Sequence, residues 1–152
     1  MRLPRAFIAA FVIVIAISAS PVVAEECVVW SEGPNFPAEE VVAYATGISR
    51  EDVTDAAGNA LTEVAAVLRR DRENFHTAAV PGRGDEAEGL FADPVNLRLF
   101  EDASVIFYCD WTVEDRAFLV TDILGARLES RVHVTVYARP DGTFALHVEA
   151  WG

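Results

Sequence analysis

The C-terminal part of the chain shows the most regular alternation of apolar and polar residues. Every second residue is apolar over residues 132–138 and again over 144–150, which is the period of a strand with one buried face. The Pro-Asp-Gly segment at 140–142 favours a tight turn, because proline presets φ and glycine accepts a positive φ. A three-residue turn places Ala138 opposite Phe144 and aligns the apolar faces, whereas a two-residue turn would set apolar against polar residues. The sequence therefore predicts a long C-terminal β-hairpin.

A helical period marks the segment that follows Ser49. Ser49 with Asp52 three positions later has the residue pattern of a helix N-cap. Arginines in the late turns would complement the helix dipole. These features predict a long helix from Ser49 to about Phe75. Its apolar positions recur every three or four residues and are Val53, Ala57, Ala60, Leu61, Val64, Val67 and Leu68.

Three further segments are assigned from shorter patterns. We expect a short helix over residues 38–48, with Gly47 at its end. Apolar and polar residues alternate over 95–99 and over 105–111, which predicts two strands. The second of these strands places Cys109 on the core side of the sheet, and the tryptophans are expected mainly in the core.

Two other segments are a loop and an ambiguous element. Residues 81–89 are rich in glycine and acidic side chains and predict a solvated loop. A Ca²⁺ site in this loop is disfavoured, because the spacing of the acids does not match an EF-hand. Residues 112–125 fit either a helix that begins after Thr112 or a strand around 118–121, and we prefer the helix.

The order of these elements indicates the fold class. Helices that precede an antiparallel sheet are typical of an α+β fold, in which the N-terminal helices pack on one face of the sheet. Here the sheet would end in the long C-terminal hairpin. The sequence contains no internal repeat, low-complexity run or linker, so we expect a single domain over residues 25–152.

Residues 1–24 have the pattern of a secretory signal peptide. A short basic start is followed by an apolar run from Ala6 to Ile17 and by small residues that end at Ala24. Cleavage after Ala24 is preferred over retention as an anchor, because the apolar run is shorter than the roughly 20 residues that a membrane span needs. We therefore expect an exported bacterial-type protein, periplasmic or secreted, with no membrane insertion after cleavage.

Export changes the interpretation of the cysteines and of the charge. In an oxidising compartment Cys27 and Cys109 are expected to form a disulfide, with two buried free thiols as the alternative. Loss of Arg2 and Arg5 with the signal peptide would change the formal net charge from −12 to −14. This charge argues against binding to nucleic acid or to anionic membranes and fits a cationic partner better. A solvated acidic surface is the simpler interpretation.

The predicted hairpin register also brings together the best candidates for chemistry. It places His133 opposite Glu149 and His147 opposite Thr135, with both histidines on the face away from the apolar side. A histidine paired with a carboxylate can act in acid–base catalysis, and two histidines with a carboxylate can bind zinc or another transition metal. An ordinary stabilising contact is the preferred interpretation, with catalysis and metal binding as alternatives.

Catalytic signatures are missing from the sequence. It contains no Gly-x-Ser-x-Gly, His-Glu-x-x-His or phosphate-loop motif, and it has no lysine for a Ser-x-x-Lys pair. No cofactor is expected. The sequence thus favours a non-catalytic, exported binding or accessory protein whose partner is an envelope protein or a small ligand. The alternative is a small hydrolase or metal-binding enzyme that uses His133, Glu149 and His147.

Overall fold

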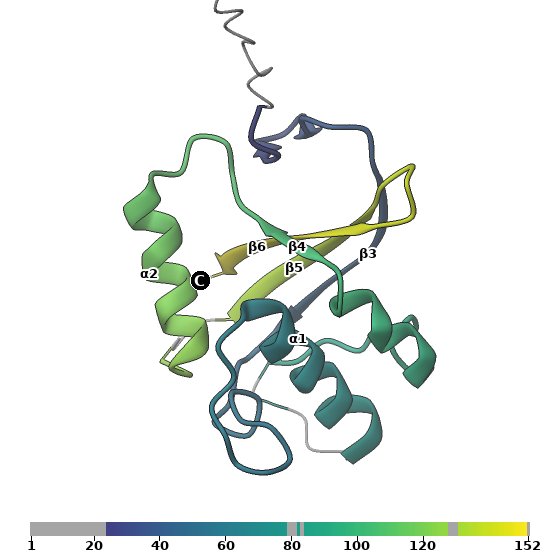
Figure 1. The fold of residues 1–152 in the computed structure, drawn as a ribbon, viewed down its shortest axis with the longest axis vertical. Coiled ribbons are helices and arrows are strands. Elements are labelled where there is room, and N and C mark those ends of the chain that lie inside the picture. The colour runs from purple at the N-terminus through teal and green to yellow at the C-terminus, as the bar shows by residue number, and fades with distance from the viewer. Residues whose placement is uncertain (1–23, 79–81, 83, 128–130, 152) are drawn as a thin grey trace, which may run out of the picture.

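The computed structural model describes residues 24–78, 82, 84–127 and 131–151. The predicted signal peptide thus lies almost wholly outside the described residues. The main element is a four-stranded sheet in the order β3-β5-β6-β4 (Figure 1). Its strands are β3 (Glu39–Thr46), β4 (Ser104–Ile106), β5 (Arg131–Ala138) and β6 (Phe144–Trp151). Strands β3, β5 and β6 pair antiparallel, whereas the short edge strand β4 runs parallel to β6.

The C-terminal hairpin has the predicted register. Ala138 pairs with Phe144, and the pairing continues without interruption to the far end of both strands. Gly142 has a φ of 86°, and its amide donates to the Arg139 carbonyl at 3.0 Å. Glycine adopts this backbone conformation without the strain that a side chain would add. The Pro-Asp-Gly turn therefore fixes which residues of β5 and β6 share a face.

The helices cover one face of this sheet, and the α+β fold class is confirmed (Figure 1). They are α1 (Val64–Glu73), which continues as the π-helical turn η1 (Asn74–Ala78), the 3₁₀ helix η2 (Pro94–Phe100) and α2 (Val113–Leu124). The core forms between the helices and the sheet. Its fully buried apolar side chains are Val67, Leu68, Phe91, Ile123, Val132, Val134, Val136, Leu146 and Val148.

The prediction of a helix over residues 38–48 is wrong, because most of this segment is β3. Val42, Tyr44 and Thr46 pair with β5 residues of the apolar face. Tyr44 and Thr46 are buried, in keeping with the alternation of a strand. The pairing partner lies about 90 residues further along the chain, so the local helical pattern did not decide the structure.

The long helix predicted from Ser49 is also wrong in its first half, since α1 begins only at Val64. The backbone amide and hydroxyl of Ser49 do donate to Asp52, but this contact closes a turn that no helix follows. Asp55 then accepts hydrogen bonds from the amides of Ala57 and Asn59, and Gly58 has a φ of 85°. This second turn prevents a helix from forming before α1.

The structure also decides the three segments that were predicted from shorter patterns between residues 95 and 125. Residues 95–99 belong to η2 rather than to a strand, because Asp93 caps the Val95 amide and Pro94 occupies the first helical position. The strand predicted over 105–111 extends only to Ile106. Helix α2 is confirmed, and its capping box joins Thr112 and Asp115.

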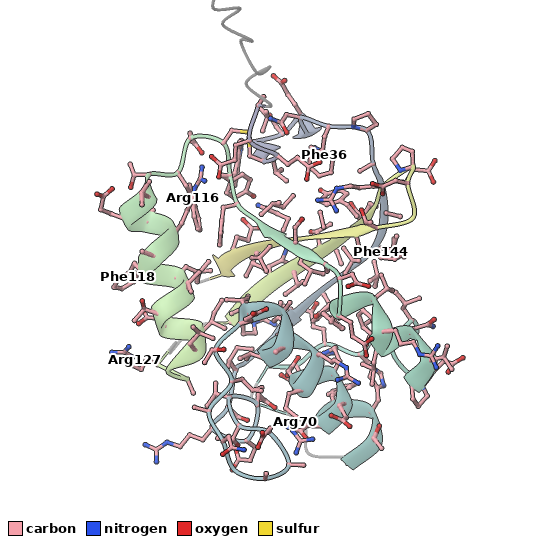
Figure 2. All side chains as sticks on the ribbon, in the orientation of Figure 1. Phe36, Arg70, Arg116, Phe118, Arg127 and Phe144 are labelled. Carbon is pink, nitrogen blue, oxygen red and sulfur yellow. A yellow bond between two sulfur atoms is a disulfide. The ribbon has the colours of Figure 1, made fainter. Side chains whose placement is uncertain are left out.

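The second face of the sheet carries the N-terminal segment rather than helices. Strands β1 (Val28–Val29) and β2 (Gly33–Pro34) form a small hairpin there. Val28 packs with Ile106, Tyr137 and Ala145 in a second apolar cluster, to which Phe36 also contributes (Figure 2). The predicted disulfide between Cys27 and Cys109 is confirmed, and it fastens this segment to the chain beyond β4. Cys109 itself is exposed, so its expected place on the core side is wrong.

Candidate functional site

The second face of the sheet brings the candidate histidines together with aromatic residues that sequence reasoning did not include. We call this surface the aromatic face and define it by Trp30, Tyr108, Trp111, His133, His147 and Glu149. His133 and Glu149 lie opposite each other on β5 and β6, as predicted, and their Nδ1 and Oε1 atoms are 3.2 Å apart. His147 lies opposite Thr135, also as predicted. The contact is thus present, but a catalytic or metal-binding use of it stays a prediction.

Tyr108 adds a second contact to Glu149. Its hydroxyl donates to the Oε2 atom of the carboxylate at 2.6 Å. Burial of the ring and this hydrogen bond to a negatively charged group both raise the pKa of the Tyr108 hydroxyl above its usual value. Glu149 therefore holds a neutral tyrosine on one oxygen and faces His133 with the other.

His147 is the most deeply buried member of the aromatic face, with 3% of its surface exposed. Its ring meets the Tyr108 ring edge to face, with the centroids 4.5 Å apart. Burial lowers the pKa of His147 to about 4, so the imidazole is neutral at neutral pH. Its buried Nε2 atom finds no hydrogen-bond partner within the described part of the chain.

The outer part of the aromatic face is a row of rings. Trp30 is 69% exposed, which corrects its expected place in the core, and its ring centroid lies 5.2 Å from that of Tyr108. The Trp111 ring centroid lies 5.8 Å from that of Tyr108, and Trp111 also packs against the main core, so it ends the row at the border of the face. Trp30 and Tyr108 each lie close in sequence to a cysteine of the disulfide, Cys27 or Cys109. The bond therefore holds the two parts of the row together.

The fold contains a second polar cluster that the sequence did not reveal, centred on Arg72 of α1. The side chain of Arg72 is completely buried, between the rings of Tyr44 and Phe75. Its guanidinium lies 2.8 Å from Asp71, and it donates to the Thr46 hydroxyl at 2.9 Å. Sequence reasoning treated Arg72 only as one of the late-turn arginines that complement the helix dipole. The interruption of an apolar helix face by the Asp-Arg pair was the available signal.

The acidic loop completes this Arg72 network. Asp85 and Glu88 lie 4.0 and 3.7 Å from the guanidinium, and both side chains are almost fully buried. Glu88 also contacts His76, which therefore belongs to this network rather than to the aromatic face. The expectation that this loop is solvated is wrong for these two acids.

The same loop covers the outer edge of β3. The Glu86 amide donates to the Ala45 carbonyl at 2.8 Å, and the Gly47 amide donates to Asp85 at 2.9 Å. Asp71 stands behind this contact and accepts from the Thr46 hydroxyl at 2.8 Å. Burial raises the pKa of Asp71 to about 6, against the opposing effect of Arg72. The charged groups of the Arg72 network contact one another, which indicates a structural role.

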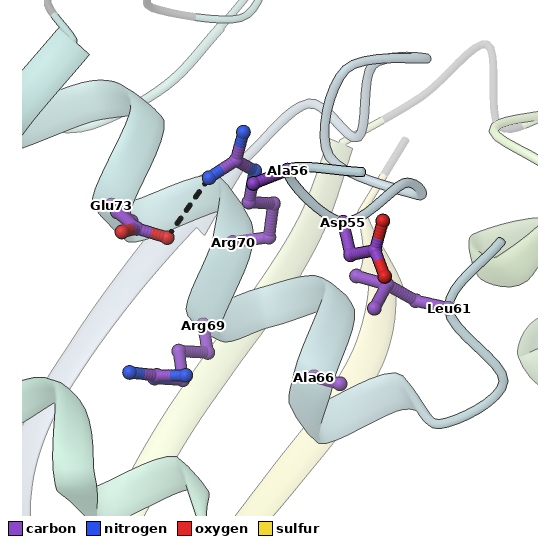
Figure 3. A pocket seen from close by; sticks show the side chains of 7 residues that line it. All are labelled: Asp55, Ala56, Leu61, Ala66, Arg69, Arg70 and Glu73. Carbon is purple, nitrogen blue, oxygen red and sulfur yellow. Dashed lines mark hydrogen bonds and ion pairs between the residues drawn. The ribbon is translucent and has the colours of Figure 1, made fainter. Parts of the chain in front are cut away.

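Two pockets are lined by residues that belong to neither cluster. One, of about 240 Å³, opens beside α1 and is lined by the side chains shown in Figure 3. Its two arginines are already paired, Arg70 with Glu73 at 3.1 Å and Arg69 with Glu101 at 3.7 Å. Another, of about 420 Å³, lies between residues 37–39 and 138–140 at the tip of the hairpin. Neither is lined by His133, His147 or Glu149.

Among residues 24–78, 82, 84–127 and 131–151, no group of three or more His, Cys, Asp and Glu side chains is arranged to hold a metal ion. None of the helices described is both long enough and apolar enough to cross a membrane. Comparison with protein-family models, with curated proteins and with solved structures finds no match to this chain.

Proposed function

We propose that this chain is an exported binding or accessory protein of the cell envelope, and that it binds its partner through the aromatic face. The exposed ring of Trp30 carries this proposal. Large aromatic side chains are enriched at the energetic centres of protein interfaces. The Trp30 ring is supported from beneath by Tyr108 and held in place by the neighbouring disulfide. A rigid support reduces the entropy lost on binding.

Two observations support the proposed compartment. Disulfides persist in secreted and periplasmic proteins and are rare in the cytosol, and this chain has one between Cys27 and Cys109. Residues 1–24 have the composition of a secretory signal. The intact mass of the exported protein tests both: we expect the mass of residues 25–152, reduced by about two mass units for the disulfide.

The binding role is tested by comparing two exposed aromatic residues. Phe118 on α2 is 71% exposed, like Trp30, but it points away from the sheet and lies outside the aromatic face (Figure 2). Immobilised wild-type protein, Trp30→Ala and Phe118→Ala are exposed to envelope extract, and each retained protein is then purified and titrated. We expect a partner that binds wild type and Phe118→Ala but not Trp30→Ala. Equal binding by all three chains would refute the proposed use of this face.

A hydrolase is the second candidate, and the His133–Glu149 pair favours it. A carboxylate that contacts Nδ1 orients the other ring nitrogen of the histidine as a general base for water. The test is hydrolysis of a panel of ester and amide substrates by wild type and His133→Ala. Activity that disappears in a variant of unchanged stability would support this candidate over the binding role.

A further inference from the structure

Charge complementarity indicates what kind of partner fits the aromatic face. The chain has 24 acidic and 12 basic residues, of which two lie in the predicted signal peptide. Such an excess attracts cations and repels a second copy of the same chain. Asp110, which follows the disulfide, and Glu149 both act electrostatically on Tyr108. Carboxylates therefore adjoin the row of rings.

The row itself has the chemistry of a cation site. Tryptophan and tyrosine faces attract ammonium and guanidinium groups, and tryptophan does so most strongly. Tyr108 donates its proton toward Glu149, which leaves more electron density on its ring. Trp30, the outermost ring, has most of its surface open to solvent. A cation that rests on it is within the field of the neighbouring acids.

The same fold already places arginines on aromatic rings. The Arg72 guanidinium lies 4.5 Å from the centre of the Tyr44 ring, and that of Arg139 lies 5.3 Å from the centre of Phe36. Each of these arginines also contacts an acid, Asp71 or Glu26. A ring beside a carboxylate is thus an arrangement that this molecule uses for guanidinium groups. On the aromatic face the ring and the carboxylate are present.

The second-face histidine His147 has a buried polar atom without a partner in the described segments. The Nε2 atom of His147 lacks a hydrogen-bond partner among the residues that the structure describes, although His147 is almost fully buried. A core that served only for packing is expected to satisfy such a group. The ring of His147 meets that of Tyr108 edge to face, and Tyr108 is the ring shared by all contacts of the row.

We propose that the aromatic face binds a segment of a partner protein that is rich in lysine and arginine, with the cationic side chains resting on Trp30 and Tyr108 beside Glu149. This inference rests on the proposed binding function and names the chemistry of the partner. An extended basic segment places cations on the rings and is also attracted by the surrounding negative charge. A second copy of this acidic chain would cover the rings but would be repelled by that charge.

The test is a fluorescence titration with synthetic peptides. Ten-residue peptides that alternate glycine with arginine, glutamine or glutamate are added to the folded protein at low and at high salt, and tryptophan emission is recorded. We expect binding of the arginine peptide alone, weakened by salt. The Trp30→Ala variant lacks one of the reporting tryptophans. Its peptide binding is therefore measured by the change in fluorescence anisotropy of a labelled peptide.

Matched variants separate the face from the general charge. We expect Trp30→Ala to weaken arginine-peptide binding about two- to fivefold, the size of an exposed cation–π contact. Glu149→Gln should weaken it by up to about fivefold, because it removes a carboxylate charge. Phe118→Ala and Glu114→Gln, at exposed positions of α2, should bind like wild type. Equal binding of the glutamine peptide, or an unchanged affinity in Trp30→Ala, overturns the inference. So does a dimer that Trp30→Ala dissociates in sedimentation experiments.

Failure of this inference is distinguishable from failure of the proposed function. A captured partner that depends on Trp30 but has no basic segment contradicts the inference and leaves the binding function standing. If no captured protein depends on Trp30 and the arginine peptide does not bind, both fail together.

Discussion

Tyr108 and Glu149 are joined by a hydrogen bond of 2.6 Å, although they lie 41 positions apart in the chain. Tyr108 follows β4 and precedes a cysteine of the disulfide, whereas Glu149 is near the end of β6. The bond therefore connects the disulfide-linked segment to the central hairpin.

Replacement of Tyr108 by phenylalanine removes the hydrogen bond and keeps the ring. Because the acceptor is charged and partly shielded from water, we expect the free energy of unfolding to fall by about 1–2 kcal/mol in urea titrations. Tyr137→Phe is the matched control on the same face, since the Tyr137 hydroxyl makes no hydrogen bond within the described residues. A loss of equal size in both variants would contradict the role given to Glu149.

Protonation of His147 should destabilise the fold in acid. Its pKa is lowered from 6.5 to about 4 by burial, so the unfolded chain binds the proton more readily. Stability due to the neutral imidazole is complete above pH 6.5 and is lost as the pH falls toward 4. We expect wild type to lose roughly 1–3 kcal/mol relative to His147→Gln over this range in urea titrations. Parallel pH profiles for the two proteins would disprove the assignment.

Asp71 should act in the opposite direction. Its pKa is raised from 3.8 to about 6, so here the folded state binds the proton more readily. Its contribution to stability is greatest below pH 4 and decreases as the pH rises toward 6. We expect wild type to lose roughly 1–3 kcal/mol relative to Asp71→Asn over this interval in urea titrations. A constant difference between these proteins would show that the carboxyl does not titrate there.

Removal of Arg72 should be far more damaging than removal of an exposed arginine. Arg72→Leu leaves Asp71, Asp85 and Glu88 buried without their cation, which we expect to cost about 3–5 kcal/mol. Arg69→Leu on the same helix breaks only a surface contact with Glu101 and should cost less than about 1 kcal/mol. Thermal unfolding of both variants makes the comparison, and similar midpoints would refute the central role of Arg72.

The disulfide closes a loop with a sequence separation of 82 residues. On the chain-entropy model, a loop of this length stabilises the folded state by about 4–5 kcal/mol. We expect the Cys27→Ser, Cys109→Ser double variant to lose stability of this order and to lose the contact between Trp30 and Tyr108. Urea titration measures the first effect and tryptophan fluorescence the second. A double variant as stable as wild type would show that other contacts hold the N-terminal segment.

The sequence predicted the elements whose determinants are local. The register of β5 and β6 depends on a turn at 140–142 and on alternation within each strand. The start of α2 depends on Thr112 and Asp115, three residues apart. The His133–Glu149 contact was predictable for the same reason, because the turn alone sets which residues face each other.

The remaining features depend on partners that are distant in sequence. Strand β3 has a pattern compatible with a helix, and only its pairing with β5 decides the outcome. Burial of Arg72 requires the Asp85 loop and the Thr46 hydroxyl to meet α1 from two sides. The position of Trp30 depends on how the N-terminal segment crosses the sheet. Local periodicity contains none of this information.

The cross-link between Cys27 and Cys109 also determines what a protease can achieve. The exposed turn at residues 56–60 and the exposed residues of the acidic loop both lie between the two cysteines. A single cut at either place therefore yields two polypeptides that stay covalently joined, with their shared sheet and core intact. One nick in either of these loops therefore leaves the molecule in one piece.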